Sequence, residues 1–268
     1  MNKHIITLLL IFLGSNLIAK EFNLEALLKK KIPTITKVTK LKAKDHFVQE
    51  YEIMLTQPLD HNNPSAGSFE HRVFLPHVDR KSPMLIVTEG YGARQRTYEL
   101  SKILKSNQLT VEYRYYGKSA PLKMDWNYLK NDHAMDDLHK LRKLFGKIYK
   151  KKWVATGISK GGSTTLIYKS KYPKDVKASV PYVAPLALAQ EDKRCDEHIL
   201  TTGSDACRQH LEDLQIAMLK NREAILPMVN EWATENKQQF TFMTTDKAFE
   251  YAVLELSLIH ISEPTRPY

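Results

Sequence analysis

The pattern of apolar and polar positions divides the chain into two parts. Up to residue 185, short apolar runs alternate with segments of helical periodicity, a pattern typical of strands joined by helices. From residue 191 to 254 the strand signals stop, and apolar residues recur at helical spacing among lysine, arginine and glutamate. We therefore expect a sheet with crossover helices, followed by a helical region.

The first strands are predicted as an antiparallel pair. Residues 47–55 alternate polar and apolar side chains, and residues 68–77 form the partner strand after a turn rich in Pro, Asp and Asn. We expect this pair to form an edge of the sheet. Residues 22–44, which precede it, predict a helical start followed by a Lys/Thr-rich link.

The pattern then becomes that of a βαβ protein. A continuous apolar run at 84–88 indicates a strand covered on both faces, and further strands are predicted at 109–117 and 176–185. Residues 131–149 repeat apolar side chains at helical spacing and predict a crossover helix. This alternation predicts a mostly parallel sheet.

One segment carries candidate chemistry. Residues 153–162 read Trp-Val-Ala-Thr-Gly-Ile-Ser-Lys-Gly-Gly, an apolar strand that runs into G-x-S-x-G, and residues 163–171 predict a helix. Strand, tight turn and helix with serine at the apex form the nucleophile elbow of the α/β-hydrolase fold. Ser159 would be the nucleophile, and the Lys160 N–H would donate to a tetrahedral oxyanion. Gly157 and Gly161 flank a turn too tight for side chains. An ordinary Gly-rich βα turn is the alternative.

The fold expectation sets the domain boundaries. Residues 20–185 would form the N-terminal part of an α/β-hydrolase domain, and residues 186–255 an incomplete helical cap over the serine. The final strands of the fold would be missing from this chain.

Composition changes the picture little. The chain is 43% hydrophobic and 26% charged, as in globular proteins, and carries a formal charge of +10. The lysines are scattered, and the runs at 29–31 and 150–152 lack interleaved aromatic residues, so a solvated basic face is favoured over nucleic-acid binding. We expect no metal and no cofactor, since the sequence has no C-x-x-C pair and His198 and His210 each stand alone.

The amino terminus indicates export. Residues 1–19 combine a basic start, an apolar core and small residues near a cleavage point, as in a secretory signal peptide. We expect a secreted or periplasmic protein without a stable membrane anchor once the signal is cut. In an oxidising compartment, Cys195 and Cys207 predict one disulfide, stabilising by about 3 kcal/mol. Two free thiols, or half of a metal site, are the alternatives.

Several motifs occur together in one order. They are Gln57-Pro58-Leu59-Asp60-His61, Thr88-Glu89-Gly90-Tyr91-Gly92, Glu112-Tyr113-Arg114-Tyr115-Tyr116-Gly117-Lys118-Ser119, Asp125-Trp126, the elbow, Tyr172-Pro173-Lys174-Asp175-Val176 and Tyr182-Val183-Ala184-Pro185. Together they resemble the bacterial secreted tripeptidyl-aminopeptidase family of serine peptidases, relatives of the prolyl carboxypeptidases and dipeptidyl peptidases. The resemblance covers roughly residues 47–255.

The resemblance implies acylation of Ser159 and release of tripeptides from peptide substrates with a free N-terminus. It implies a second oxyanion donor near Gly90 and Tyr91, and a substrate-ammonium anchor at Glu89, with Glu112 as an alternative. Each carboxylate has an equally weighted structural interpretation, in which it pairs with an arginine such as Arg114.

The resemblance also implies an Asp and then a His after Ser159, and the sequence supplies neither. Residues 256–268 resemble a translated sequencing adaptor, so we exclude them, His260 included, from fold and mechanism. Without a triad histidine, kcat falls by about 10⁴–10⁶, so we expect this chain alone to be inactive.

Three functions compete at this point. The first is a serine aminopeptidase, and the second is an esterase, carboxypeptidase or dipeptidyl peptidase of the same fold. The third is a non-catalytic binding protein on a hydrolase scaffold.

Overall fold

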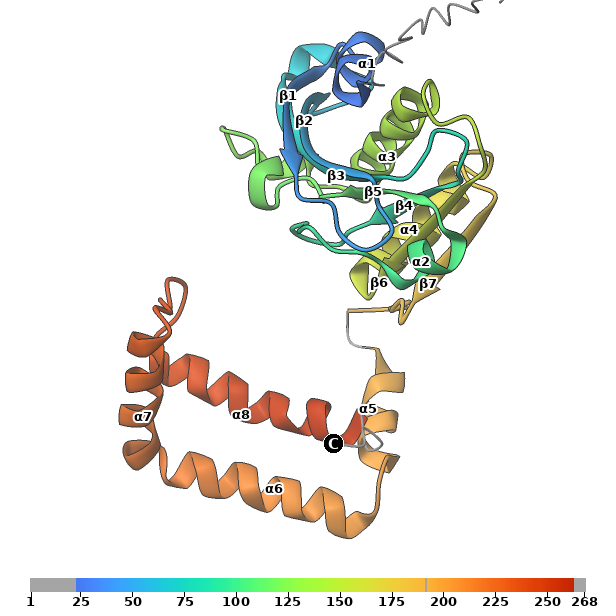
Figure 1. The fold of residues 1–268 in the computed structure, drawn as a ribbon. Helices are drawn as coiled ribbons and strands as arrows, with labels where there is room; N and C mark the ends of the chain where they lie inside the picture. Colours follow the sequence, from blue (N-terminus) through green and yellow to red (C-terminus); the bar gives the residue numbers. More distant parts are fainter. Residues whose placement is uncertain (1–22, 191, 263–268) are drawn as a thin grey trace, which may run out of the picture. The chain divides into compact units, whose positions relative to one another are not determined.

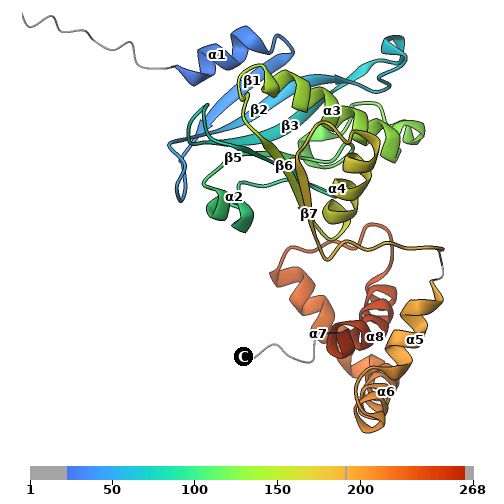
Figure 2. The same cartoon turned by 90° about the vertical axis from the view of Figure 1, so that its right-hand side faces the viewer.

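The computed structural model describes residues 23–190 and 192–262, so the expected signal peptide lies outside the described residues. The chain divides into two compact units, the first ending at Leu186 and the second starting at Ala187 (Figures 1 and 2). Each unit is described below by itself.

The first unit is built on a sheet of seven strands within the described residues. Its order is β1-β2-β3-β5-β4-β6-β7. Each neighbouring pair from β1 through β2 and β3 to β5 is antiparallel, whereas the neighbouring pairs among β5, β4, β6 and β7 are parallel. The sheet is thus mixed, and its parallel half carries the elbow. The strands are β1 (Ile35–Leu41), β2 (Gln49–Pro58), β3 (Ser68–His77), β4 (Met84–Thr88), β5 (Asn107–Val111), β6 (Trp153–Ile158) and β7 (Ala178–Tyr182).

Four of the described helices cover the sheet. They are α1 (Leu24–Lys31), α2 (Glu99–Leu104), α3 (Asn131–Gly146) and α4 (Lys160–Lys171), and short 3₁₀ turns lie at Pro64–Ala66, Gly117–Ser119 and Trp126–Tyr128. Apolar residues of α1, α3 and α4 share one buried cluster with strand residues such as Ile86, while Leu85 and Val87 point to the other face and join Tyr98 beside α2. Because strand side chains alternate, β4 contributes to both layers, which is why its five residues are all buried.

Strands β3 and β4 begin and end where the apolar pattern predicts, and β6 begins at the predicted Trp153. The link expected within 22–44 was wrong in part, since it contains β1, which pairs with β2 and takes the edge position. The helix expected from residue 163 begins at Lys160. Helix α2 was not predicted, because six residues are too few to show a helical period.

The second unit is helical, with α5 (Lys193–Thr201), α6 (Asp205–Lys220), α7 (Arg222–Glu235) and α8 (Thr245–Ser262). Helix α8 packs against the other three. Asp192 and Ser204 cap α5 and α6 by accepting backbone N–H groups. None of the described helices combines the length and apolar character needed to cross a bilayer.

The expected disulfide is not formed in the structure. Cys195 and Cys207 are free, exposed thiols near the starts of α5 and α6. The rest of α5 rises about 9 Å beyond Cys195, and α6 then leaves in another direction (Figure 1). The structure thus leaves both thiols free, and their pairing in an oxidising compartment stays a prediction.

Candidate active site

Ser159 occupies the turn between β6 and α4. Its backbone has φ 56° and ψ −125°, a combination that a side-chain-bearing residue adopts only under strain. The Ser159 N–H donates to the Tyr182 carbonyl at 3.0 Å, and its own carbonyl accepts the Ser163 N–H at 3.1 Å. The side chain is exposed. The bond to β7 and the first bond of helix α4 therefore hold the serine side chain outward at the end of the parallel strands.

The two elbow glycines are close to other backbone atoms. A Cβ on Gly157 would lie 2.2 Å from the Gly161 carbonyl oxygen, and one on Gly161 would lie 2.5 Å from the Thr88 carbonyl oxygen. Such approaches are far inside van der Waals contact. The turn is therefore packed against the end of β4 with no room for side chains.

A hydroxyl network fastens β4 to the elbow helix. Thr88 Oγ1 donates to the Gly161 carbonyl at 2.8 Å and lies 2.5 Å from Thr165 Oγ1, all buried. The loop that follows, at 89–92, consequently starts beside the elbow. A Cβ on Gly90 would come within 2.7 Å of Lys160 Cβ, which shows how closely this loop approaches.

This approach places unpaired donors next to the serine turn. Among the described residues, no acceptor takes a hydrogen bond from the amides of Gly90, Tyr91 or Lys160. Backbone N–H groups at a helix start and in a facing loop are the usual components of an oxyanion hole. The residues expected to supply it are thus brought together, with donors available.

Glu89 and Glu112 differ sharply in their surroundings. Glu112 is fully buried and accepts hydrogen bonds from the Arg72 guanidinium, the Ala93 and Ser119 amides and the Ser119 hydroxyl. Its oxygens are fully engaged, so Glu112 cannot serve as the ammonium anchor. The arginine it pairs with is Arg72, not Arg114 as suggested from the sequence.

Glu89 retains contact with open space. It accepts a hydrogen bond from the Tyr98 hydroxyl and lines a depression of about 460 Å³. Burial raises the pKa of the Glu89 carboxyl. Arg94 and Arg96 line the same depression, and their positive charge opposes an incoming ammonium. The anchor role of Glu89 stays a hypothesis.

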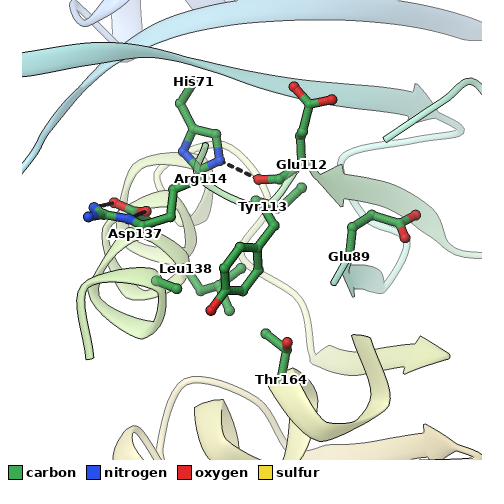
Figure 3. Close-up of a pocket in the computed structure, with 10 residues that line it drawn as sticks. His71, Glu89, Glu112, Tyr113, Arg114, Asp137, Leu138 and Thr164 are labelled. Carbon is green, nitrogen blue, oxygen red and sulfur yellow. Dashed lines mark hydrogen bonds and ion pairs between the residues drawn. The ribbon is translucent and has the colours of Figure 1, made fainter. Parts of the chain in front are cut away.

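A buried polar cluster beside the sheet was missed by sequence reasoning (Figure 3). Arg114 makes a bidentate pair with Asp137, at 2.8 and 2.9 Å, and donates to the carbonyls of Leu59 and Tyr128. Burial acts to raise the pKa of Asp137, but hydrogen bonds from His61 and Arg114 outweigh it and lower that pKa. The only available signal was Asp137 itself, a carboxylate on the apolar face of the 131–149 helix.

The cavity in this cluster is too small for a substrate. It measures about 10 Å³, close to the least that holds one water molecule, and His71, Glu112 and Thr164 help to line it. His71 is buried, with Nε2 2.6 Å from the Glu112 carbonyl and no partner for Nδ1 among the described residues. We assign this cluster to the framework that holds β5 against α3.

No described residue is hydrogen-bonded to the Ser159 hydroxyl, and the lack of a triad Asp and His stays a prediction. His139 lies 2.7 Å from Asp175 and stacks on Tyr172, while His198 contacts Thr202 within α5 and His210 is exposed on α6. The described part of the chain also holds no cluster of three or more His, Cys, Asp or Glu suited to a metal ion.

The sequence comparisons decide the family. The model of the PS-10 peptidase S37 family matches residues 26–261. The chain belongs to this family. The S37 match agrees with the resemblance drawn from the motifs, and with a nucleophile elbow on a mixed sheet it establishes the α/β-hydrolase fold. The match also includes the first six residues of the segment 256–268 expected to be foreign.

Two curated relatives extend the S37 assignment. A prolyl tri/tetrapeptidyl aminopeptidase from Streptomyces mobaraensis is 37% identical over 204 residues, covering 75% of this chain and 43% of the relative. A probable serine protease from Arabidopsis thaliana is 23% identical over 237 residues, covering 77% and 48%. The S37 chain described here thus spans about half the length of the curated relatives it matches.

Solved structures similar to this S37 chain include a proline iminopeptidase from Mycobacterium smegmatis. It has a TM-score of 0.44 and 12% identity, and the match covers 77% of this chain and 69% of that one. An acetyl xylan esterase from Thermoanaerobacterium has a TM-score of 0.42 and 16% identity, covering 70% and 65%.

Proposed function

We propose that the full protein is an exported serine peptidase that removes tripeptides or similar units from free N-termini. The observation that carries this proposal is Ser159 at a strained, exposed elbow with unpaired amides beside it. Family membership and the 37% identical tri/tetrapeptidyl aminopeptidase support the substrate class.

The chemistry would proceed in two steps. Ser159 Oγ attacks the scissile carbonyl and its proton passes to a histidine base, while the amides of Lys160 and the 90–91 segment stabilise the oxyanion. The C–N bond then breaks as the base protonates the leaving amine, which leaves a tripeptidyl ester on Ser159. Water hydrolyses this ester with the same base.

The histidine and its aspartate partner are part of the proposal. Since no described side chain is hydrogen-bonded to the Ser159 hydroxyl, we place both outside the described residues and propose that residues 1–268 alone do not hydrolyse peptides. A free N-terminus would be recognised beside the 89–92 loop, with Glu89 as the anchor candidate. The helical unit from Ala187 would act as the cap.

Paired substrates test this proposal. The full-length protein is given peptides that are identical except for a free or an acetylated N-terminus, and the products are identified by mass spectrometry. We expect tripeptides only from the free form and no hydrolysis by Ser159→Ala. Equal cleavage of both forms would contradict the aminopeptidase assignment and favour an esterase or another peptidase of this fold. No labelling of Ser159 by a fluorophosphonate would favour a non-catalytic binding protein.

A further inference from the structure

The Lys160 side chain has an environment unusual for a lysine at a helix start. Its ammonium nitrogen lies 3.5 Å from the ring centroid of Tyr113, 5.0 Å from that of Tyr91 and 5.6 Å from that of Tyr116. The rings contact one another edge-on, Tyr116 touching both neighbours. An ammonium within about 6 Å of a ring is attracted to its face. The three tyrosines thus form a cage that holds this charge in one place.

From this cage the ammonium reaches the loop that faces the elbow. Lys160 Nζ donates to the Gly90 carbonyl at 2.5 Å. Gly90 permits this contact because its missing Cβ would overlap Lys160 Cβ and the Gly161 amide. The side chain therefore bridges α4 and the loop across a gap that only a glycine leaves open.

The hydrogen bond from Lys160 Nζ to the Gly90 carbonyl also sets the direction of the neighbouring amide. The Gly90 carbonyl and the Tyr91 N–H belong to one planar trans peptide group, so they point in opposite directions. Holding the carbonyl toward Lys160 consequently sets the direction of the Tyr91 N–H. A donor on the carbonyl also polarises the peptide group and strengthens its N–H as a donor.

The chain is held by β5 and its exit before Gly90 and after it. The Glu89 N–H, which belongs to the 88–89 peptide, donates to the Val111 carbonyl at 3.2 Å, and the Tyr91 carbonyl, which belongs to the 91–92 peptide, accepts the Tyr113 N–H at 3.0 Å. Among the described residues, the peptide between Gly90 and Tyr91 is held by Lys160 Nζ alone. Its orientation depends on this one side chain.

We propose that the Lys160 side chain is a positioning residue that orients the Tyr91 N–H as the second oxyanion donor. Lys160 then serves the oxyanion twice, through its own backbone N–H and through the peptide that its ammonium holds. The catalytic part of this inference rests on the proposed function, whereas the orientation of the 90–91 peptide does not.

The test compares lysine variants of the full-length protein. Lys160→Met keeps the length of the side chain and its packing against the rings but removes the charge and the donor. Lys160→Arg retains both. Lys169→Met is the matched control, because Lys169 lies on the same helix and also donates to backbone carbonyls, those of Pro173 and Val176. For each variant, kcat and KM are measured on a free-N-terminus peptide amide, and a crystal structure gives the orientation of the 90–91 peptide.

Losing one oxyanion donor typically lowers kcat about 10²–10³-fold. We expect Lys160→Met to lower kcat by about 10²-fold with KM changed less than about twofold, and to rotate the 90–91 peptide. Lys160→Arg should recover most of kcat, and Lys169→Met should match the wild type. An equal loss of kcat in Lys169→Met would indicate a general effect on α4.

The two readouts separate this inference from the proposed function. If the 90–91 peptide keeps its orientation in Lys160→Met, or if kcat is unchanged there, the positioning role is wrong even in an active peptidase. If the wild-type protein hydrolyses no peptide, the proposed function fails, while the crystal structure still decides whether Lys160 orients the peptide.

Discussion

At the residue scale, the sequence predicted the serine at the elbow turn but not the partners of the carboxylates. The G-x-S-x-G spacing predicts Ser159 at the turn because local backbone sterics dictate that spacing. The close backbone contacts of the turn explain why Gly157 and Gly161 carry no side chain. The pairs between Arg72 and Glu112 and between Arg114 and Asp137 join residues 40 and 23 positions apart, so no local pattern reveals them. Whether these carboxylates are buried decides their roles, and the burial of a single carboxylate depends on the whole fold rather than on the local sequence.

Glu112 gives the first prediction. Replacing it by alanine removes the buried carboxylate that the Arg72 guanidinium bonds, although Glu52 still lies 3.7 Å from that guanidinium, and it leaves three further donors unsatisfied. We therefore expect a loss of about 3 kcal/mol in the free energy of unfolding. Urea denaturation of the full-length protein measures this. Glu99→Ala, at an exposed position of α2, is the control. A loss below about 0.5 kcal/mol would show that the pair does not stabilise the fold.

Glu89 gives a pH-dependent prediction. Burial raises the pKa of its carboxyl, so the folded state binds the proton more readily than the unfolded state does. Stability therefore falls as pH rises through the folded pKa, and the cost is absent below the unfolded pKa of about 4.3. Glu89→Gln should raise the urea midpoint at pH 7 more than at pH 4. An equal effect at both values would contradict this, and a higher KM for free N-termini would support the anchor role.

At the element scale, continuous apolar runs were sufficient to predict strands that are buried on both faces. Strand β4 has its predicted ends because all five of its residues are buried and both of its faces demand apolar residues. Strand β1 was missed because it lies at the edge and none of its residues is fully buried, so lysines and threonines occupy it without alternation. A strand is therefore hardest to predict from sequence where it buries the fewest side chains.

The packing of the elbow against β4 gives the next prediction. In Gly157→Ala the new methyl group would overlap the Gly161 and Thr88 carbonyls, so we expect a loss of about 3 kcal/mol and a melting temperature lower by about 10 °C. Differential scanning calorimetry measures it. Gly92→Ala is the matched control, because its Cβ would meet Glu112 Oε1 at an ordinary 3.7 Å. Equal melting temperatures for both variants would show that the elbow can relax.

At the scale of the whole molecule, the change from strand to helical patterning predicted a helical region, and the chain divides after Leu186. Which of the helices α5 to α8 pack against each other could not be predicted, because their apolar residues show only that helices pack together. The segment joining the units contains exposed leucines at 186 and 188, 63% and 78% exposed, outside helices and strands.

Exposed irregular segments are preferred sites of proteolysis. We expect brief thermolysin treatment to cut first at Leu186 or Leu188 and to release two fragments that resist further digestion, as followed by mass spectrometry. Substituting both leucines by glycine should slow this cut. First cleavage inside α3 or β4 would contradict the division into two units.

The central claim is that Ser159 is acylated by the N-terminal part of a peptide. The most direct measurement is an acid quench of the full-length protein during turnover of a tripeptidyl thioester, followed by peptide mapping. We predict a tripeptidyl adduct on the peptide that contains Ser159, formed only when the substrate N-terminus is free. An adduct on another residue, or the same adduct from the acetylated substrate, would contradict it.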